Sequence, residues 1–360
     1  MSQATILGRA ARGWTRAASA TPMVGVVDVL LRGLGQVMLQ NNPATGLVLA
    51  AGVLVGDPLL AVAGLVGLGS STLAAHLLGA EHGLIRDGQF GFNGVLVGIA
   101  LAANLRPDSL LVLYVIAAGA SSTLVLLALG HLLGRYQVPV LTAPFVLVTW
   151  AGLLAADRLD HLDPDGPGVP APSRAGTFEG SFAGSFEALL RGISQVVLQD
   201  SWATGLLLLF GVLLSSRISA LFAVVGSTVG AATALALGGQ DPSVVHGVFG
   251  FNAVLSAIAV GGLFFVLTWC SALLAVLAAA GAAALTAGMA AVLAPSGEPA
   301  LTAPFVLVTW LCVLAGRAVP ALRPVALADV ITAEQVRRDH RTGGGTPPTP
   351  PGSDPPPVTR

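Results

Sequence analysis

The hydrophobic residues of this chain occur in long blocks that polar residues rarely interrupt. In the first part of the sequence the blocks are Ala44–Gly56, Leu59–Gly79, Phe90–Asn104, Leu110–Leu133 and Val140–Ala156. A half-buried strand would alternate apolar and polar residues, and a soluble helix would carry polar residues on one face. Neither pattern is present, and a helix needs about 20 apolar residues to cross a bilayer. The pattern therefore predicts membrane-spanning helices.

Composition supports the same class of protein. Of 360 residues, 54% are hydrophobic and only 10% are charged, against roughly 25% charged residues in soluble domains. The stretch Gly247–Leu293 contains no charged residue. The net charge of −1 leaves no basic surface for a nucleic acid. We predict an all-α polytopic membrane protein whose surroundings are membrane lipid and which has no nucleic-acid partner.

The chain also contains an internal duplication. Three segments recur after 159 or 160 residues: RGLGQVMLQNNPATGL from Arg32 as RGISQVVLQDSWATGL from Arg191, FGFNGVL from Phe90 as FGFNAVL from Phe249, and LTAPFVLVTW from Leu141 again from Leu301. A constant offset between matching segments is the signature of a tandem repeat. Each half is therefore expected to contain the same set of helices.

The number of helices in each half predicts their relative orientation. The segment Val24–Gln40 contains Asp28 and Arg32, which suit lipid contact poorly, so we expect it to enter the membrane only half-way. Five crossings then remain in each half. Because five is odd, the second half must run in the opposite direction. We predict two inverted repeats, each of five transmembrane helices and one half-spanning helix, with ten spans in total.

Polar segments suggest the domain boundaries and the orientation in the membrane. We expect a cytoplasmic N-terminal segment, a first repeat, an extracytoplasmic linker, a second repeat and a disordered cytoplasmic tail over residues 1–20, 21–160, 161–182, 183–322 and 323–360, respectively. Arginines flank both ends, whereas the linker is acidic. By the positive-inside tendency both termini are cytoplasmic, in the plasma or inner cell membrane. Inverted repeats with interrupted helices place a transport site near the midplane.

Each half carries an acid and an arginine four residues apart, Asp28 with Arg32 and Glu187 with Arg191. On a helix this spacing favours an ion pair. A proton or ion pathway would also use such groups. Because no other acid recurs within the predicted spans, an ion-coupled pump is the weaker interpretation.

A glutamine follows at the end of each half-helix, Gln36 and Gln195. An unpaired buried amide costs a few kcal/mol, so each side chain must find a partner. It can bond to neighbouring backbone. Alternatively, the amide and the free carbonyls of the helix end can offer a row of acceptors to a solute.

The FGFN segments place Phe92 and Phe251 at equivalent positions, each with a leucine one helical turn later, at Leu96 and Leu255. This spacing is typical of core packing. In a duplicated transporter the two aromatic rings can instead face each other across a flat slot. The asparagines that follow, Asn93 and Asn252, are expected to bond to backbone near a helix start.

The repeated LTAPF segments contain Thr142 and Thr302. Pro144 and Pro304 favour a helix start directly after these threonines. Each threonine is then a candidate N-cap. Near the midplane its hydroxyl can equally point into a pore.

Together, the paired LTAPF motifs, GQVMLQNNPATG with SQVVLQDSWATG, and the GFN segments resemble the urea transporter family over residues of about 20–320. The resemblance implies a channel for passive, uncoupled diffusion of urea, which assembles as a homotrimer with a pore in each protomer. It also implies a slot walled by phenylalanines, with oxygen ladders at the half-helices and two threonines at the centre. Some relatives have a glutamate at one ladder position, where this chain has glutamine in both halves.

The resemblance assigns the following substrate-binding residues: Gln36, Val37, Phe92, Leu96, Thr142, Gln195, Val196, Phe251, Leu255 and Thr302. Phe92 and Phe251 would form the walls, the leucines and valines would complete the slot, the glutamines would begin the ladders and the threonines would line the constriction. Urea suits such a site because it is planar and neutral, with four N–H donors and one carbonyl acceptor. Successive weak sites let a solute both enter and leave.

The alternatives are a channel for another small neutral solute, a channel for ammonia or ammonium, and an intramembrane enzyme. An ammonium pathway would use histidines at the midplane, but the six histidines show no pairing in a repeated motif; His82 and His246, for example, are 164 residues apart. An enzyme would need a metal cluster or a nucleophile with its base, and the spans show neither. We expect no enzymatic activity, no metal and no cofactor.

Overall fold

The computed structural model describes residues 14, 17, 18, 20–159, 162, 182–238 and 241–342. Within these residues the chain is helical, and its β structure is limited to one isolated bridge between Phe265 and Pro324. The predicted all-α class is therefore confirmed for the described residues. Most of the predicted linker, residues 1–13 and residues 343–360 lie outside them.

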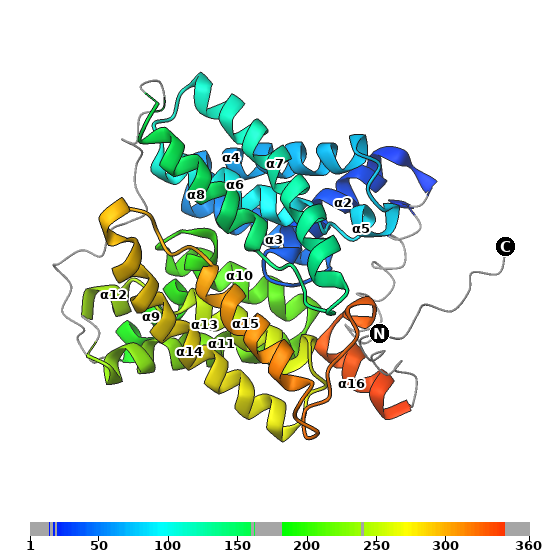
Figure 1. The fold of residues 1–360 in the computed structure, drawn as a ribbon, viewed down its shortest axis with the longest axis vertical. Helices are drawn as coiled ribbons and strands as arrows, with labels where there is room; N and C mark the ends of the chain where they lie inside the picture. The colour runs from blue at the N-terminus through cyan, green and yellow to red at the C-terminus, as the bar shows by residue number, and fades with distance from the viewer. Residues whose placement is uncertain are drawn as a thin grey trace.

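The helices of the first half recur in the same order in the second half. The first set is α2 (Pro22–Gln36), α3 (Pro43–Gly56), α4 (Pro58–Leu77), α5 (His82–Arg86), α6 (Gly91–Asn104), α7 (Ser109–Gly134) and α8 (Ala143–Ala156). The second set is α9 (Phe182–Ser194) with the 3-10 turn η1 (Gln195–Val197), α10 (Trp202–Ser215), α11 (Arg217–Ala236), α12 (Asp241–Val245), α13 (Phe251–Ile258) with the π-turn η2 (Ala259–Leu263), α14 (Trp269–Leu293) and α15 (Ala303–Gly316). Figure 1 shows the two sets one above the other.

Equivalent helices start with different capping residues. Asn42 caps α3 by accepting hydrogen bonds from Ala44 and Thr45, whereas Ser201 caps α10 by accepting one from Thr204. Either side chain satisfies amide groups that the first turn of a helix leaves free. The duplicated fold has thus kept its helix starts while the capping residues diverged.

Hydrogen bonds between the halves are reciprocal. The Thr45 hydroxyl donates to the Gly211 carbonyl at 2.7 Å, and the equivalent Thr204 donates to Gly52 at 3.0 Å. Trp150 and Trp310 do the same, since their indole N–H groups donate to the carbonyls of Pro299 and Pro139, respectively. If residue i contacts j′ and j contacts i′, the two units are related by a two-fold operation. The halves therefore meet as a pseudo-symmetric pair.

Four helices are long and apolar enough to cross a membrane: α4, α7, α11 and α14. The α9–η1 segment and α10 pass the same test together, but they are bent by 76° at the break between them. Five further apolar helices, among them α3, α6 and α8 of 14 residues each, measure about 21 Å against a hydrocarbon core of about 30 Å. By length and composition, four or five spans are supported rather than the predicted ten.

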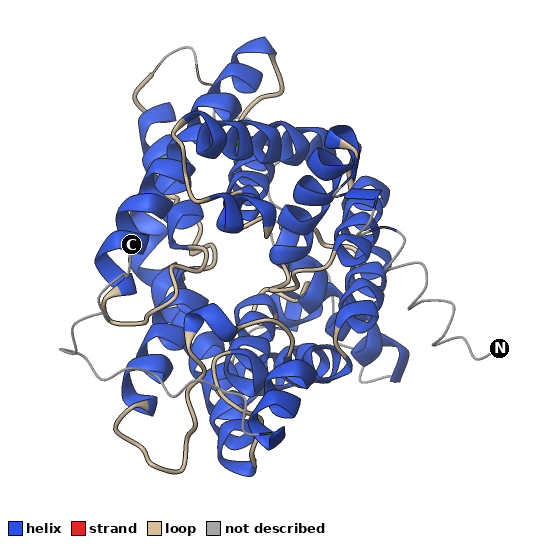
Figure 2. Ribbon diagram, turned by 90° about the vertical axis from the view of Figure 1, so that its right-hand side faces the viewer, coloured by secondary structure: helices blue, strands red, loops and turns tan. Residues whose placement is uncertain are grey.

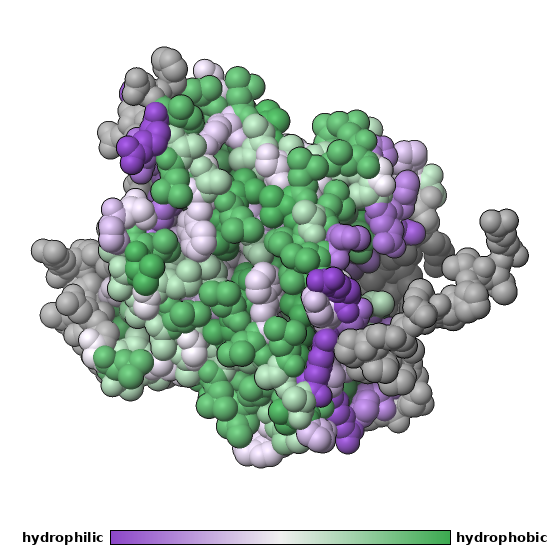
Figure 3. Space-filling view, viewed as in Figure 1, coloured by the Kyte–Doolittle hydropathy of each residue, from purple (hydrophilic) through white to green (hydrophobic). Residues whose placement is uncertain are grey.

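The outer surface is apolar over a broad area. Figure 3 shows a hydrophobic face bordered by hydrophilic groups at its two sides. Leucines of α7, α14 and α15 are largely exposed, as at Leu113 (63%), Leu277 (60%) and Leu311 (67%). Contiguous exposed apolar surface of this kind marks contact with lipid or with another protein. The chain is a multi-pass membrane protein.

The segment after α15 differs from the sequence prediction. A disordered tail was expected from residue 323, but residues 323–342 are ordered and end in α16 (Ala333–Thr342). Backbone bonds join Val266 to Arg323 and Val325 to Phe264, and the Glu334 carboxylate accepts the amide hydrogen of Ile218 at the start of α11. Ala333 and Val336 are buried. The polar composition of the segment gave no indication of these contacts, because they are made by backbone groups, one carboxylate and a few small apolar side chains.

Candidate functional site

The two glutamines are held in the same way, at the ends of the helices that were predicted to be half-spanning, α2 and α9 with η1, here called the half-helices. Gln36 is the last residue of α2, and its amide nitrogen donates to the Asp87 carbonyl at 3.2 Å. Gln195 begins η1, and its amide nitrogen donates to the His246 carbonyl at 2.9 Å. In each glutamine the side-chain nitrogen donates to a backbone carbonyl, so the side-chain oxygen does not take part in that hydrogen bond. The two alternatives for these glutamines are thus compatible: the nitrogen bonds to backbone and the oxygen is left as an acceptor.

Each half-helix ends in a strained turn. Leu39 and Leu198 have φ values of +59° and +56°, a left-handed conformation that leucine rarely adopts. Such strain persists only where the surrounding structure imposes it, and it gathers at functional sites. Since both halves keep a leucine in this conformation, the helix break is a feature of the fold and not of one repeat.

The two asparagines take over the capping of α8 and α15. The Asn93 side chain accepts the Phe145 amide hydrogen at 3.0 Å and donates to the Leu141 carbonyl at 3.3 Å. Asn252 makes the same two bonds, to Phe305 at 3.2 Å and Leu301 at 3.1 Å. The prediction that these side chains bond to backbone near a helix start is therefore confirmed.

Because the two asparagines cap α8 and α15, the threonines are not needed as caps. Thr142 and Thr302 occupy the N-cap positions, but neither side chain makes a capping hydrogen bond. Their hydroxyl oxygens lie 2.6 Å apart and share a hydrogen bond. Both residues are 2% exposed. The N-cap alternative is wrong, and the two hydroxyls form one polar spot inside an apolar core.

The apolar candidates are all buried. Phe92 is the second residue of α6 and Phe251 the first of α13. All of the apolar candidates belong to one continuous core: Val37, Phe92, Leu96, Val196, Phe251 and Leu255. A cavity of about 380 Å³ is lined by Gln36, Phe92 and Leu141, together with Leu327 and Ile331 of the C-terminal segment. Of the ten predicted residues, only Gln36 and Phe92 line this cavity. It leads from the first glutamine to the residue before Thr142.

Figure 2 shows the helices surrounding a central region toward which several loops turn. Left-handed leucines occur in both kinds of loop: Leu39 and Leu198 follow the half-helices, and Leu141 and Leu301 directly precede the threonines at the starts of α8 and α15. Helix ends and loops expose carbonyl and amide groups that continuous helices would consume internally. Polar backbone is therefore available in the interior of an otherwise apolar protein.

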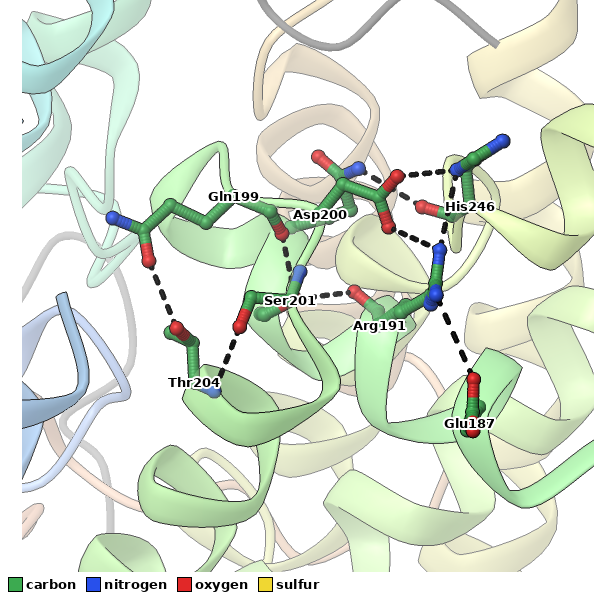
Figure 4. Close-up of polar contacts among 9 residues, drawn as sticks. Glu187, Arg191, Gln199, Asp200, Ser201, Thr204 and His246 are labelled. Atoms are coloured by element: carbon green, nitrogen blue, oxygen red, sulfur yellow. Dashed lines mark hydrogen bonds and ion pairs between the residues drawn. The ribbon is translucent and has the colours of Figure 1, made fainter. Parts of the chain in front are cut away.

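The acid–arginine pairs are ion pairs, as their spacing predicted. Arg32 bonds to Asp28 at 2.7 Å, and Arg191 approaches Glu187 at 3.6 Å. The second half adds two residues that the sequence analysis missed, since Asp200 contacts both Arg191 and His246 (Figure 4). At the repeat offset of 159, His246 is equivalent to Asp87 and not to His82. This alignment would have identified His246 as a residue of the second half-helix end.

Among the described residues, no three His, Cys, Asp or Glu side chains are grouped so that they could hold a metal ion. The two threonine hydroxyls bond to each other and the two glutamine amides bond to backbone carbonyls, whereas the acids Asp28 and Asp200 are paired with arginines. This arrangement suits a neutral solute with several hydrogen-bonding groups.

Comparison with known proteins agrees with this arrangement. A family model described as urea transporter matches residues 27–317. The chain is 33% identical to urea transporter 1 of Ovis aries over 317 residues, and 33% identical to urea transporter 1 of Rattus norvegicus over 316 residues. Each match covers 86% of this chain and 82% of the relative. On the repeat, the paired site residues and these matches, the chain belongs to the urea transporter family.

Proposed function

We propose that the protein is a urea channel through which urea diffuses passively, without coupling to an ion. The observation that carries the proposal is the hydrogen bond between Thr142 and Thr302, whose oxygens lie 2.6 Å apart. Equivalent residues of two halves can touch only at the pseudo-two-fold axis. The hydroxyl pair therefore marks the centre of the duplicated structure, where a pore shared by both halves would pass.

The hydroxyl pair offers both kinds of hydrogen bond that urea needs. When one threonine donates to the other, the second still has its own O–H to donate, and both oxygens keep free lone pairs. A urea molecule beside the pair can accept from the free O–H with its carbonyl and donate an N–H to an oxygen. Either threonine can be the donor, so the pair can present its free O–H toward either half.

The glutamines extend the row of acceptors on either side. Their nitrogens are held by Asp87 and His246 backbone carbonyls, which orients the oxygens of Gln36 and Gln195 as acceptors for urea N–H groups. We propose that Phe92, Phe251, Leu96, Leu255, Val37 and Val196 form a flat apolar slot between these ladders. Such a slot admits a planar molecule edge-on and provides no compensation for the hydration that an ion would lose.

The wider arrangement follows from the same proposal. We infer two inverted repeats with ten spans, in which the short helices are completed by loops that lie in the protein interior. Both termini are cytoplasmic, the membrane is the plasma or inner membrane, and three protomers assemble into a homotrimer in a lipid bilayer. Each protomer contains its own pore, because the residues proposed for it all come from one chain.

The contacts do not favour an ammonium channel. The described histidines lie at helix ends, in turns or on the C-terminal helix, as at His131 in the last turn of α7 and His340 on α16. His246 contacts Asp200 beside an ion pair. None of them contacts Thr142 or Thr302, so the central polar spot lacks a base that could accept a proton from ammonium.

The test is stopped-flow light scattering on proteoliposomes that contain the full chain, with an inward urea gradient. We expect much faster equilibration than in empty vesicles. Thr142→Val with Thr302→Val should reduce urea permeability about five-fold, the factor that corresponds to the loss of one net hydrogen bond to a neutral solute. Urea permeability equal to that of empty vesicles, combined with rapid ammonium or formamide flux, would falsify the proposal.

The repeated decapeptide provides a matched control. Thr149 and Thr309 occur in the same two motifs and are fully buried, and their hydroxyls lack a hydrogen-bond partner among the described residues. Thr149→Val with Thr309→Val makes the same chemical change away from the hydroxyl pair. We expect unchanged urea permeability, which separates the loss of the central hydroxyls from a general effect of two threonine-to-valine substitutions.

A further inference from the structure

The two half-helix ends differ in charge although they share a backbone arrangement. We call the set of residues near each glutamine a mouth. The first mouth consists of Asp28, Arg32, Asn41 and Asp87. The second mouth consists of the equivalent residues Glu187, Arg191, Asp200 and His246. In each mouth the last residue of the set supplies the carbonyl that holds the glutamine nitrogen. Asn41 and Asp87 of the first mouth thus correspond to Asp200 and His246 of the second mouth.

In the first mouth the arginine is satisfied by its own helix and by an amide. Arg32 donates to the Asp28 carboxylate at 2.7 Å through Nε and to the Asn41 side-chain oxygen at 2.7 Å. Trp14 donates a further hydrogen bond to Asp28. Every side chain in this set is an acid, an arginine or an amide, and none of these types changes charge between pH 5 and 8 at its ordinary pKa.

In the second mouth the arginine turns toward the loop instead. Arg191 contacts the Asp200 carboxylate at 3.0 Å, while Glu187 is 3.6 Å away with a side chain that is 51% exposed. The Nε of Arg191 is buried and has no partner among the described residues. Asp200 is thus the main counter-ion of Arg191, and its side chain is only 9% exposed.

The second carboxylate oxygen of Asp200 contacts Nδ1 of His246 (Figure 4). That same nitrogen lies 3.5 Å from Arg191. It can donate to Asp200 when it carries a proton, or accept from Arg191 when it does not, but it cannot do both. A protonated imidazole carries hydrogens on both nitrogens, so protonation of His246 commits it to Asp200.

The backbone of the same histidine holds the ladder glutamine. The His246 carbonyl accepts the Gln195 amide nitrogen at 2.9 Å. The loop that carries Asp200 is itself anchored, because the Ser194 hydroxyl donates to the Gln199 carbonyl at 2.6 Å. A side-chain bond between Asp200 and His246 therefore joins a fixed loop to the residue whose carbonyl orients Gln195.

We propose that Asp200 and His246 form a positioning pair for Gln195, and that protonation of His246 makes urea flux pH-dependent at the second mouth alone. The groups that face the imidazole are Asp200 from the loop before α10 and Arg191 from α9, with Glu187 one turn away. We expect urea permeability to be higher at pH 5.5 than at pH 8, because protonation commits the imidazole to Asp200.

This inference rests on the proposed urea channel. The residues of the two mouths provide the substitutions that test it. His246→Ala and Asp200→Asn each remove the pair. Asp200→Asn combined with His246→Asp installs the residues of the first mouth. His82→Ala is the control, because His82 is an exposed histidine on α5 of the other half. Urea flux is measured in proteoliposomes at pH 5.5, 6.5 and 8, with equal pH inside and outside.

We expect each single variant to lower urea permeability at pH 5.5 by up to about five-fold, the factor that corresponds to one net hydrogen bond, and to flatten the pH profile. The double exchange should restore permeability while the profile stays flat. His82→Ala should keep the profile of the wild type. Elution of each variant as the wild-type species in detergent shows that it has folded, and the exchange variant retains a test if a single variant does not fold.

The outcomes separate this inference from the proposed function. A wild-type chain that does not conduct urea contradicts the channel itself. A conducting wild type with the same flux at all three pH values, or a His246→Ala variant that keeps the wild-type profile, overturns the positioning pair and leaves the channel intact. An exchange variant as slow as the single variants also overturns it, since the first-mouth residues would then fail to replace the pair.

Discussion

The hydroxyl oxygens of Thr142 and Thr302 lie 2.6 Å apart, although the residues are 160 positions apart in the chain. They are equivalent members of a duplicated decapeptide, so their contact lies at the pseudo-two-fold axis of the molecule. The hydrogen bonds of Asn93 and Asn252 make this contact possible, because they satisfy the backbone that a threonine at an N-cap would otherwise serve.

Because the two hydroxyls bond to each other, their contributions to urea permeability should not be additive. We expect Thr142→Val and Thr302→Val to lower flux by similar factors, and the double variant to lower it by less than the product of the two. Thr142→Ser with Thr302→Ser keeps both O–H groups and should keep most of the flux. Stopped-flow measurements on the wild type, the two single valine variants and the double valine variant complete the cycle, and strictly multiplicative effects would show that the hydroxyls act separately.

Asn93 should be important for stability, because its side chain is fully buried and serves two backbone groups. Asn93→Ala leaves the Phe145 N–H and the Leu141 carbonyl unpaired, which costs about 2–4 kcal/mol of unfolding free energy for two buried polar groups. Asn93→Asp keeps the acceptor for Phe145 and should cost less at neutral pH only if the carboxyl is protonated.

The measurement for Asn93 is thermal unfolding in detergent, followed by urea flux at a temperature where each variant is folded. Asn252→Ala is the matched variant in the second half, where Thr286 also accepts from the amide. Equal stability of Asn93→Ala and the wild type would contradict the assigned bridging role.

Gly46 should tolerate no side chain, because a Cβ there would lie 1.7 Å from the Leu31 carbonyl oxygen. The equivalent Gly205 approaches Leu190 in the same way, at 1.9 Å. Gly46→Ala forces α2 and α3 apart, and we expect a loss of about 3 kcal/mol from overpacking together with displacement of Gln36 at the end of α2. The unfolding temperature in detergent and the urea flux should both be lower than those of the wild type.

Gly281 provides the control for this substitution. It lies on α14, and a Cβ added there meets no atom within 4 Å. Gly281→Ala should be neutral, or stabilising by up to about 1 kcal/mol through helix propensity. If Gly46→Ala were as stable as Gly281→Ala, the close approach of α2 and α3 would not be obligatory.

Glu298 should make stability fall as the pH rises. It lies in the loop before α15, and burial, followed by the nearby charge of Asp157, raises its pKa from an ordinary 4.5 to about 7. The folded protein thus favours the protonated carboxyl. The resulting stabilisation is complete below pH 4.5 and is lost as the pH rises through 7.

Glu298→Gln removes this titration while it keeps the size of the side chain. We expect little difference in unfolding temperature at pH 5, and at pH 8 a variant more stable than the wild type by an amount on the order of 1–3 kcal/mol. Thermal unfolding in detergent between pH 5 and pH 8 measures how the stability difference between Glu298→Gln and the wild type changes with pH. A wild type that gains stability relative to Glu298→Gln on going from pH 5 to 8 would contradict the prediction.

Local sequence patterns were sufficient for much of this fold. The apolar blocks, the prolines at helix starts and the constant offset of the repeats identified the helices and paired them, because helix formation depends on neighbouring residues. The ion pairs of Arg32 and Arg191 were equally predictable, since they connect residues four positions apart. The same patterns also placed glutamines and threonines at the breaks between helices.

Length and polarity were less reliable guides. The apolar blocks predicted ten spans; several of the corresponding helices have only 14 residues, so length and composition by themselves support four or five. The segment from residue 323 to 342 was too polar to predict a packed element, yet Glu334 caps α11 and Ala333 is buried. Contacts of this kind depend on what the rest of the fold places nearby.

By itself, the sequence determined the helical class, the duplication and the residue types available at each helix break. Tertiary structure alone decided which of these residues meet: Thr142 with Thr302, Asn93 with the start of α8, and His246 with Asp200. The physical reason is that these bonds join residues 46 to 160 positions apart. A polar side chain at such a position has several possible partners in the sequence, and only the packed fold selects one of them.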